Sequence, residues 1–316
     1  MSEPLVLHEQ KGKRLRRPWL GYAMVLTATA LWGINGSMAK AALSSGLTSL
    51  RLTEVRSTGA ALILVVALAL TRPRSLRFTR KELPFLLLFG VVGLAFVQLF
   101  YFVAIHRLDI GIALLIQYLA PILIALYARI VLKERVRRRV WAALILALCG
   151  LSLVVDLWSG VSLDGIGVAA SLAASVTFAL YILLAENAVT RRDPVSLLAI
   201  GFTLAAVFWA IVQPWWSFPT EFLDDRIHMD GALFTSTLPV WALLAGVVLV
   251  GTIAPFLLLV GALRHIPATR AGVTAMFEPV AGALVAWAWL GESLTTAQLV
   301  GGAIVLTAIL LAQTAR

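Results

Sequence analysis

The fold of this chain is determined by two stretches of 15 residues, 120-APILIALYARIVLKE-134 and 278-EPVAGALVAWAWLGE-292. Both are apolar runs with proline at the second position and glutamate at the last. They lie 158 residues apart, and at that offset the longer segment 98–156 aligns on 256–314 without a gap. The chain therefore consists of two related halves, and each half contains one proline-interrupted apolar run.

The composition of the whole chain excludes an ordinary soluble protein. Of its 316 residues 60% are apolar and 13% are charged, whereas an average soluble domain is about 45–50% apolar and about 25% charged. A membrane-spanning helix needs about 20 mostly apolar residues, and the runs are too long for the strands of a β-barrel. Ten such runs predict an all-α integral membrane protein with ten transmembrane helices, at residues 20–42, 48–70, 83–105, 110–131, 139–156, 163–187, 195–213, 239–263, 268–290 and 295–313.

The ten predicted helices divide evenly between the two halves. We expect a basic tail at 1–18, a first repeat at 19–156 and a second repeat at 163–313. The first helices of the repeats also correspond, at an offset of 146, because Gly21 aligns with Gly167. Since each repeat has an odd number of helices, the second must be inverted relative to the first. Inverted repeats are the architecture with which secondary transporters alternate between two conformations.

The basic residues indicate the orientation in the membrane. Twenty of the 26 lysines and arginines lie in the N-terminal tail, the even-numbered loops or the last residue. Lysine and arginine accumulate on the cytoplasmic side of membrane proteins. Both termini are therefore predicted to be cytoplasmic in a multi-pass protein of the plasma or bacterial inner membrane. The same distribution explains the net charge of +10 without a nucleic-acid partner.

Two ionisable residues fall well inside predicted helices, where a charge is costly and is a functional hypothesis by default. Glu278 is the candidate for proton coupling or substrate contact; the alternative is that it binds backbone freed by Pro279. Arg56 either attracts an anionic group of a substrate or holds the bundle together. Arg51 and Glu54 have the spacing of a helical ion pair.

The ends of the helices carry further charges, and we expect them to reach water by snorkelling. These residues are Lys40, Asp156 and Glu186.

Several uncharged polar and aromatic residues are candidates for the wall of a central cavity. Ordinary helix packing is the alternative for each of them, and Pro121 and Pro279 mark either hinges or static kinks. Thr274 is expected on the same face as Glu278 because it lies four residues earlier. The other candidates are Trp32, Asn35, Gln98, Tyr101, Gln117, Tyr118, Tyr181 and Thr252.

These features resemble the drug/metabolite transporter superfamily, and in particular its EamA-type ten-helix exporters. The resemblance covers nearly all of residues 19–313. It implies a transporter; members export amino acids, other small metabolites or drugs, and relatives carry nucleotide sugars. Four-helix relatives keep a proton-binding glutamate in their first helix, where this chain has Asn35, so that mechanism cannot be carried over. The matching residues are Gly21 to Gly33, Arg56, Pro121 with Lys133-Glu134-Arg135, and Glu278-Pro279 followed by Leu290 to Leu294.

The sequence thus predicts a secondary-active exporter of small organic metabolites, with amino acids or their analogues first. A multidrug or cationic-compound exporter and a nucleotide-sugar-type carrier stay open as alternatives. A passive channel and an intramembrane enzyme are disfavoured, because no filter-like loop and no phosphate loop occur. The four histidines lack metal-ligand spacing, and Cys149 stands alone, so neither a cofactor nor a metal is expected. The oligomeric state, monomer or homodimer, is left open.

Overall fold

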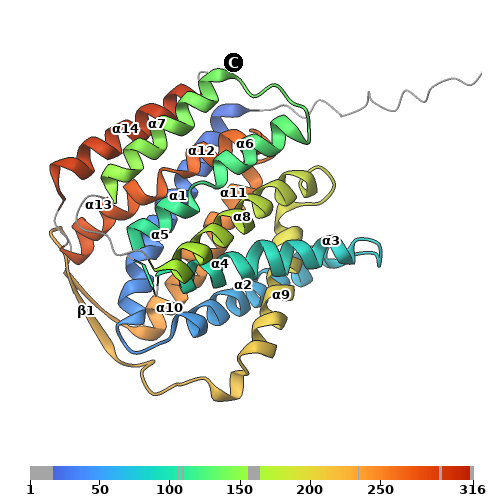
Figure 1. The fold of residues 1–316 in the computed structure, drawn as a ribbon. Helices are drawn as coiled ribbons and strands as arrows, with labels where there is room; N and C mark the ends of the chain where they lie inside the picture. The colour runs from blue at the N-terminus through green and yellow to red at the C-terminus, as the bar shows by residue number, and fades with distance from the viewer. Residues whose placement is uncertain are drawn as a thin grey trace, which may run out of the picture.

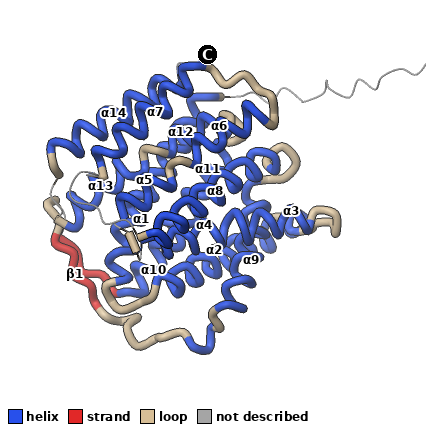
Figure 2. The backbone as a smooth tube through the Cα atoms, viewed as in Figure 1, coloured by secondary structure: helices blue, strands red, loops and turns tan. Residues whose placement is uncertain are grey.

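The computed structural model describes residues 17–105, 107–108, 110–155, 164–233, 235–291 and 294–313. They form a bundle of helices that cross one another (Figures 1 and 2). The first half contains α1 (Pro18–Leu43), α2 (Ser49–Thr71), η1 (Pro73–Leu76), α3 (Leu83–Leu87), η2 (Leu88–Phe96), α4 (Val97–Ile105), α5 (Ile110–Gln117), α6 (Ala120–Ile130) and α7 (Arg138–Val154).

The second half repeats this order. It contains α8 (Gly165–Ala188), α9 (Pro194–Val212), η3 (Trp215–Ser217), α10 (Val240–Val248), η4 (Leu249–Ile253), α11 (Ala254–Ala262), α12 (Ala268–Ala275), α13 (Glu278–Leu290) and α14 (Thr296–Gln313). Between η3 and α10 lie the only strands among the described residues, β1 (Arg226–Asp230) and β2 (Thr235–Pro239), which pair antiparallel.

Within the described residues, eight helical stretches are long and apolar enough to span a membrane. They confirm an integral membrane protein built of helices. The predicted runs at 20–42 and 139–156 correspond to α1 and to α7, a helix of 17 residues, and neither is among the eight. That these two also cross the membrane stays a prediction. The eight stretches are Ser49–Thr71, Leu83–Ala104, Ile112–Ile130, Gly165–Ala188, Pro194–Val212, Val240–Ala262, Ala268–Trp289 and Thr296–Gln313.

Irregular helix geometry recurs at matched positions of the two halves. One proline-containing run is interrupted between α5 and α6, and the other between α12 and α13. Pro121 and Pro279 both lie in the first turn after the interruption, where proline is tolerated because its missing N–H would have no helical partner. The π-helical segments η2 and η4 also correspond, because Leu249–Ile253 aligns with residues 91–95. The aligned sequences therefore adopt the same local structure.

Contacts between the halves repeat in the same way. The Cβ that Gly21 lacks would lie 2.9 Å from Cγ2 of Ile266, and the Cβ that Gly167 lacks would lie 2.7 Å from Cγ of Leu108. Gly21 aligns with Gly167, and Ile266 aligns with Leu108. Correspondingly, α1 packs against α11 and α13, while α8 packs against α4, α5 and α6. The first helix of each half thus packs against equivalent helices of the other half.

The bundle has two different ends. At the termini end, α1 begins and α14 finishes; at the hairpin end, β1 and β2 cover the end of α13 (Figure 1). The hairpin is fastened there because Trp289 Nε1 donates to Ser236 Oγ at 2.8 Å and the backbone N–H of Leu233 donates to the carbonyl of Ala288 at 3.0 Å. Arg51 and Glu54 form the predicted ion pair at the same end, with 2.6 Å between Nη1 and Oε2.

Candidate functional site

A cavity of about 440 Å³ lies between the halves and extends to the hairpin end. Its size falls in the range of small-molecule sites. Leu43, Val155 and Gln298, which lie at or next to helix ends, form part of its lining. Its remaining polar wall consists of Trp32, Asn35, Ser37, Lys40, Arg56, Tyr101 and Glu278.

Glu278 stands at the start of α13, directly after the interruption of its run. A carboxylate at this position is favoured by the positive end of the helix dipole. The hydroxyl of Tyr118 donates to Glu278 Oε2 at 2.6 Å. Tyr118 itself is buried and lies in the interruption between α5 and α6. The two helix interruptions therefore meet at one hydrogen bond, with Glu278 on the cavity side of it.

Arg56, on α2, lines the cavity and also holds two helices together. Its Nε donates to Thr252 Oγ1 at 3.0 Å, and its Nη2 donates to the carbonyl of Gly251 at 3.2 Å. Both acceptors belong to η4, and a π-helical segment leaves carbonyls without their usual helical partner. The Thr252 hydroxyl in turn donates to the carbonyl of Val247 at 2.8 Å. The structure thus gives Arg56 a clear role in packing while leaving it in the cavity wall.

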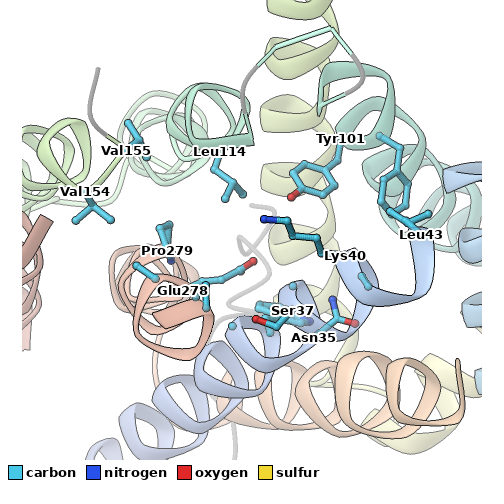
Figure 3. A pocket seen from close by; sticks show the side chains of 18 of the residues that line it. Asn35, Ser37, Lys40, Leu43, Tyr101, Leu114, Val154, Val155, Glu278 and Pro279 are labelled. Carbon is cyan, nitrogen blue, oxygen red and sulfur yellow. The ribbon is translucent and has the colours of Figure 1, made fainter. Parts of the chain in front are cut away.

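Lys40 lies in the last turn of α1 and is exposed, as predicted. Its side chain also lines the cavity, which was not predicted. In Figure 3 the Lys40 ammonium and the Tyr101 hydroxyl point into the same space as the Glu278 carboxylate. The prediction did not include the cavity because it considered only the distance to the helix end and not the neighbouring helices. Lys40 is thus a second cation in the cavity wall, beside Arg56.

The side chains of α1 complete one wall of the cavity. Trp32 packs edge-on against Phe256, with ring centroids 5.4 Å apart. Asn35 presses against Gly251 so closely that a Cβ there would lie 1.9 Å from Asn35 Oδ1. Ser37, which we did not predict, follows on the same helix. In the sequence it belongs to a stripe of small residues on the first helix, a pattern that indicates close helix packing and not a cavity wall.

Six of the predicted residues are not in the cavity wall: Gln98, Gln117, Tyr118, Tyr181, Thr252 and Thr274. Tyr181 stacks between Phe89 and Phe178 at centroid distances of 5.7 and 6.2 Å. Thr274 is buried and donates to the carbonyl of Arg270 at 2.8 Å. Thr274, predicted on the same face as Glu278, does not line the cavity with it, and the interruption between α12 and α13 lies between the two residues.

Polar contacts between helices hold the termini end together, one between the two halves and one within the second half. Tyr22 OH, on α1, lies 3.3 Å from Nη1 of Arg270 on α12. The backbone N–H of Ala268 donates to Glu186 Oε1 at 2.9 Å, so Glu186 caps α12 and does not simply reach water as predicted. Asp156, the third predicted helix-end charge, lies outside the described residues. The cavity of about 440 Å³ thus extends to the hairpin end, while these hydrogen bonds join helices at the termini end.

The model of the EamA-like transporter family matches this chain twice, over residues 19–156 and 165–314. The chain belongs to the EamA-like transporter family. The two matches fall on the two halves that the repeated sequence and the repeated packing define. Membership makes the chain a multi-pass membrane transporter with a small-molecule substrate, and the names of the family and of its relatives point to a transporter rather than an enzyme.

Two relatives are similar to this chain over about nine-tenths of their own length. The threonine/homoserine exporter RhtA of Escherichia coli K12 is 28% identical over 294 residues, which is 91% of this chain and 89% of the relative. The uncharacterized transporter YwfM of Bacillus subtilis 168 is 26% identical over 289 residues, which is 90% of this chain and 91% of the relative. A solved crystal structure with 20% identity superposes with a TM-score of 0.72 and covers 92% of this chain and 96% of that chain. That likeness concerns the fold.

Proposed function

We propose that this chain is a secondary-active exporter of amino acids or close analogues, which works by alternating access. The observation that carries the proposal is the pairing of charges in the cavity. Glu278 supplies an anion on one wall, while Lys40 and Arg56 supply cations on others. A free amino acid carries an ammonium and a carboxylate close together. Its ammonium can therefore pair with Glu278 while its carboxylate pairs with Lys40 or Arg56.

The charges also decide between the alternative substrates. An exporter of lipophilic cations needs a cavity of aromatic and acidic groups, and two cations in the wall oppose such substrates. Nucleotide sugars favour several cations, and Lys40 adds one to Arg56, but the carboxylate of Glu278 repels their phosphates. The relative RhtA is a threonine/homoserine exporter. An amino acid is therefore the substrate that agrees with both charges and with that relative.

Alternating access is supported by the relation between the two halves. Since each half contacts the other in the same way, exchanging their conformations closes the hairpin end and opens the termini end. Tyr118 and Tyr181 are buried and are absent from the wall of the present cavity. We propose that they line the cavity that opens at the termini end in the other conformation.

Energy for uphill export is proposed to come from protons that Glu278 carries. No phosphate-binding loop occurs in the sequence, so the chain has no motif for driving transport with ATP. Glu278 is the carboxylate that lines the cavity among the described residues, and it lies at the meeting point of the two interrupted helices. A change of its charge would act directly on that meeting point.

The proposed orientation places the termini end in the cytoplasm, because most basic residues lie there. We also propose that α1 and α7 cross the membrane, which gives ten helices in two inverted repeats. The cavity then opens away from the cytoplasm, in the conformation from which an exported solute leaves. In bacteria, as in the organisms of the named relatives, this corresponds to the inner membrane.

Efflux from preloaded cells tests the proposal. Cells with and without the chain are loaded with labelled threonine, homoserine or a cationic dye, and solute loss is followed with and without a protonophore. We expect faster loss of the amino acids, abolished by the protonophore, and unchanged loss of the dye. Faster loss of the dye alone would reject the amino-acid assignment, and faster loss that resists the protonophore would reject proton coupling.

A further inference from the structure

A second, smaller cavity of about 170 Å³ lies at the termini end, away from the transport site. Residues of both halves line it. Lys81 and Glu82 precede α3 in the first half, while Arg191 and Arg192 follow α8 in the second. Phe85 and Leu197 contribute apolar surface. The transport mechanism makes no use of this pocket.

The pocket lies where two membrane spans end. The span Leu83–Ala104 begins two residues after Lys81, and the span Gly165–Ala188 ends three residues before Arg191. Charged groups at such positions lie at the level of the lipid headgroups, with the hydrocarbon region directly beyond them. The basic rim therefore faces headgroups, and the apolar residues of the pocket reach toward the acyl chains.

The charges around the pocket leave a surplus of two cations. Arg192 is occupied, because its Nη2 donates to Glu82 Oε1 at 2.9 Å and to the carbonyl of Arg77 at 3.2 Å. Glu82 Oε2 accepts the backbone N–H of Thr79 at 2.7 Å. Together with Arg192, this bond holds the pKa of Glu82 below its ordinary value, so the ion pair stays formed at neutral pH.

The two remaining cations are accessible. Lys81 and Arg191 are exposed, and within the described ranges of the chain neither forms an ion pair. They come from different segments but line the same pocket. Two such cations can hold one phosphate group from two sides.

The surroundings select a lipid rather than a dissolved ion. Leu87 and Leu88 follow the pocket residues on the same helical run, and each is 42% exposed. α3 lies at the edge of the bundle in Figure 1, so this apolar surface borders the bilayer. A phospholipid can place its phosphate between the two cations and its acyl chains along these leucines. Inorganic phosphate has no apolar part and makes no favourable contact with the leucines.

We propose that this pocket binds the headgroup phosphate of an anionic phospholipid, held by Lys81 and Arg191. Basic pockets between helices on the cytoplasmic side of membrane proteins have the chemistry for such headgroups. The site is independent of the substrate cavity, so the proposal does not depend on which solute the protein carries.

Native mass spectrometry of the purified full-length chain in detergent tests the proposal. The protein is titrated with phosphatidylglycerol, with phosphatidylcholine as a lipid without net charge, and with inorganic phosphate. We expect wild type to retain phosphatidylglycerol in preference to phosphatidylcholine. The double variant Lys81→Ala/Arg191→Ala should lose about thirtyfold in affinity for it, the effect expected of two basic residues beside an anionic headgroup.

A matched control removes two other exposed cations from the same end, Arg135→Ala/Arg137→Ala, and should bind phosphatidylglycerol like wild type. Equal losses in both double variants would mean an unspecific basic surface and would overturn the proposal. Displacement of the lipid by millimolar inorganic phosphate would instead make the site one for free phosphate. The double variant Lys81→Arg/Arg191→Lys keeps both charges and should still bind phosphatidylglycerol. If this variant lost the lipid, the two residues would contribute to the structure of the protein and not to lipid binding by their charge, and the proposal would be overturned.

Discussion

The hydroxyl of Tyr118 donates to the carboxylate of Glu278 across 2.6 Å, and this bond joins the interrupted helix of the first half to that of the second. The two residues are 160 positions apart in the sequence. In an inverted-repeat transporter, the interrupted helices are the elements that bind the solute and the coupling ion. Under the proposed mechanism, a proton gained or lost at Glu278 acts on this contact between the halves.

Glu278→Gln tests whether this carboxyl carries the coupling proton. Glutamine keeps the size of the side chain and can still accept the Tyr118 hydrogen bond, but it cannot gain or lose a proton. We expect uphill, protonophore-sensitive efflux to disappear, while exchange of labelled for unlabelled solute across proteoliposomes continues. Equal loss of both activities at a normal yield of folded protein would assign Glu278 to substrate binding or packing, and unchanged uphill efflux would exclude the coupling role.

Tyr118→Phe removes only the hydroxyl that holds Glu278. A hydrogen bond to a charged group contributes about 1.5–3 kcal/mol, so we expect uphill efflux to fall about tenfold or more. Substrate affinity should change little, because Tyr118 is not in the cavity wall. Efflux and binding are measured on the same preparation.

Tyr181→Phe is the matched control for this variant. The Tyr181 hydroxyl is buried and has no hydrogen-bond partner among the described residues, so its removal should leave uphill efflux near the wild-type rate. Equal losses in both variants would show that any change in the central aromatic cluster impairs transport, and the specific role of the Tyr118 bond would then be rejected.

Lys40→Met tests the proposed contact with the substrate carboxylate. The loss of a charge-assisted hydrogen bond is expected to weaken binding of threonine about tenfold or more. Threoninamide lacks the carboxylate, so its affinity should be the same in wild type and variant, and the two effects together form a double-mutant cycle. Arg226→Met, which removes an exposed cation from the hairpin, serves as control. If Lys40→Met weakened binding of threonine and of threoninamide equally, the proposed contact between Lys40 and the substrate carboxylate would be contradicted.

The sequence was sufficient to predict the parts of this fold that depend on local composition. Span length, the repeat and the two proline interruptions follow from runs of apolar residues and from aligned prolines, and all appear near the expected positions. The helices predicted around Lys40 and Arg56 are present as α1 and α2. What Lys40 faces could not be predicted, because it depends on how α1 packs against several other helices.

The cavity wall was predictable only in part for the same reason. Trp32, Asn35, Arg56, Tyr101 and Glu278 line it, whereas the other candidates pack below it or against neighbouring helices. Spacing on an ideal helix predicted the faces, but the interruptions and the π-helical segments rotate those faces. The sequence of η4 gives no sign of a π-helix, since the tertiary contact of Arg56 with the Gly251 carbonyl is part of what stabilises it.

Gly291 and Lys133 occupy equivalent positions after the interrupted helices, and both have positive φ, 71° and 55°. Left-handed backbone costs a residue with a side chain about 1–2 kcal/mol. We therefore expect Gly291→Ala to destabilise the protein by at least that amount, because the new Cβ would also lie 2.7 Å from the Asp230 carbonyl oxygen. Lys133→Gly should be neutral or stabilise by up to about 1 kcal/mol. Thermal unfolding in detergent measures the stability of both variants. A Gly291→Ala variant more stable than wild type would contradict the left-handed backbone at Gly291.

Cysteine labelling in intact cells tests which side of the membrane the cavity faces. In a Cys149→Ala background, Gln298→Cys places one thiol in the cavity wall and Asn187→Cys places one at the termini end. If most basic residues lie in the cytoplasm, a membrane-impermeant maleimide should label only the first thiol from outside, and the second only after permeabilisation. Threonine in excess should slow labelling of the first, because substrate and reagent then compete for one space. The reverse labelling pattern would invert the proposed orientation and turn the described conformation into the one that loads its solute from the cytoplasm.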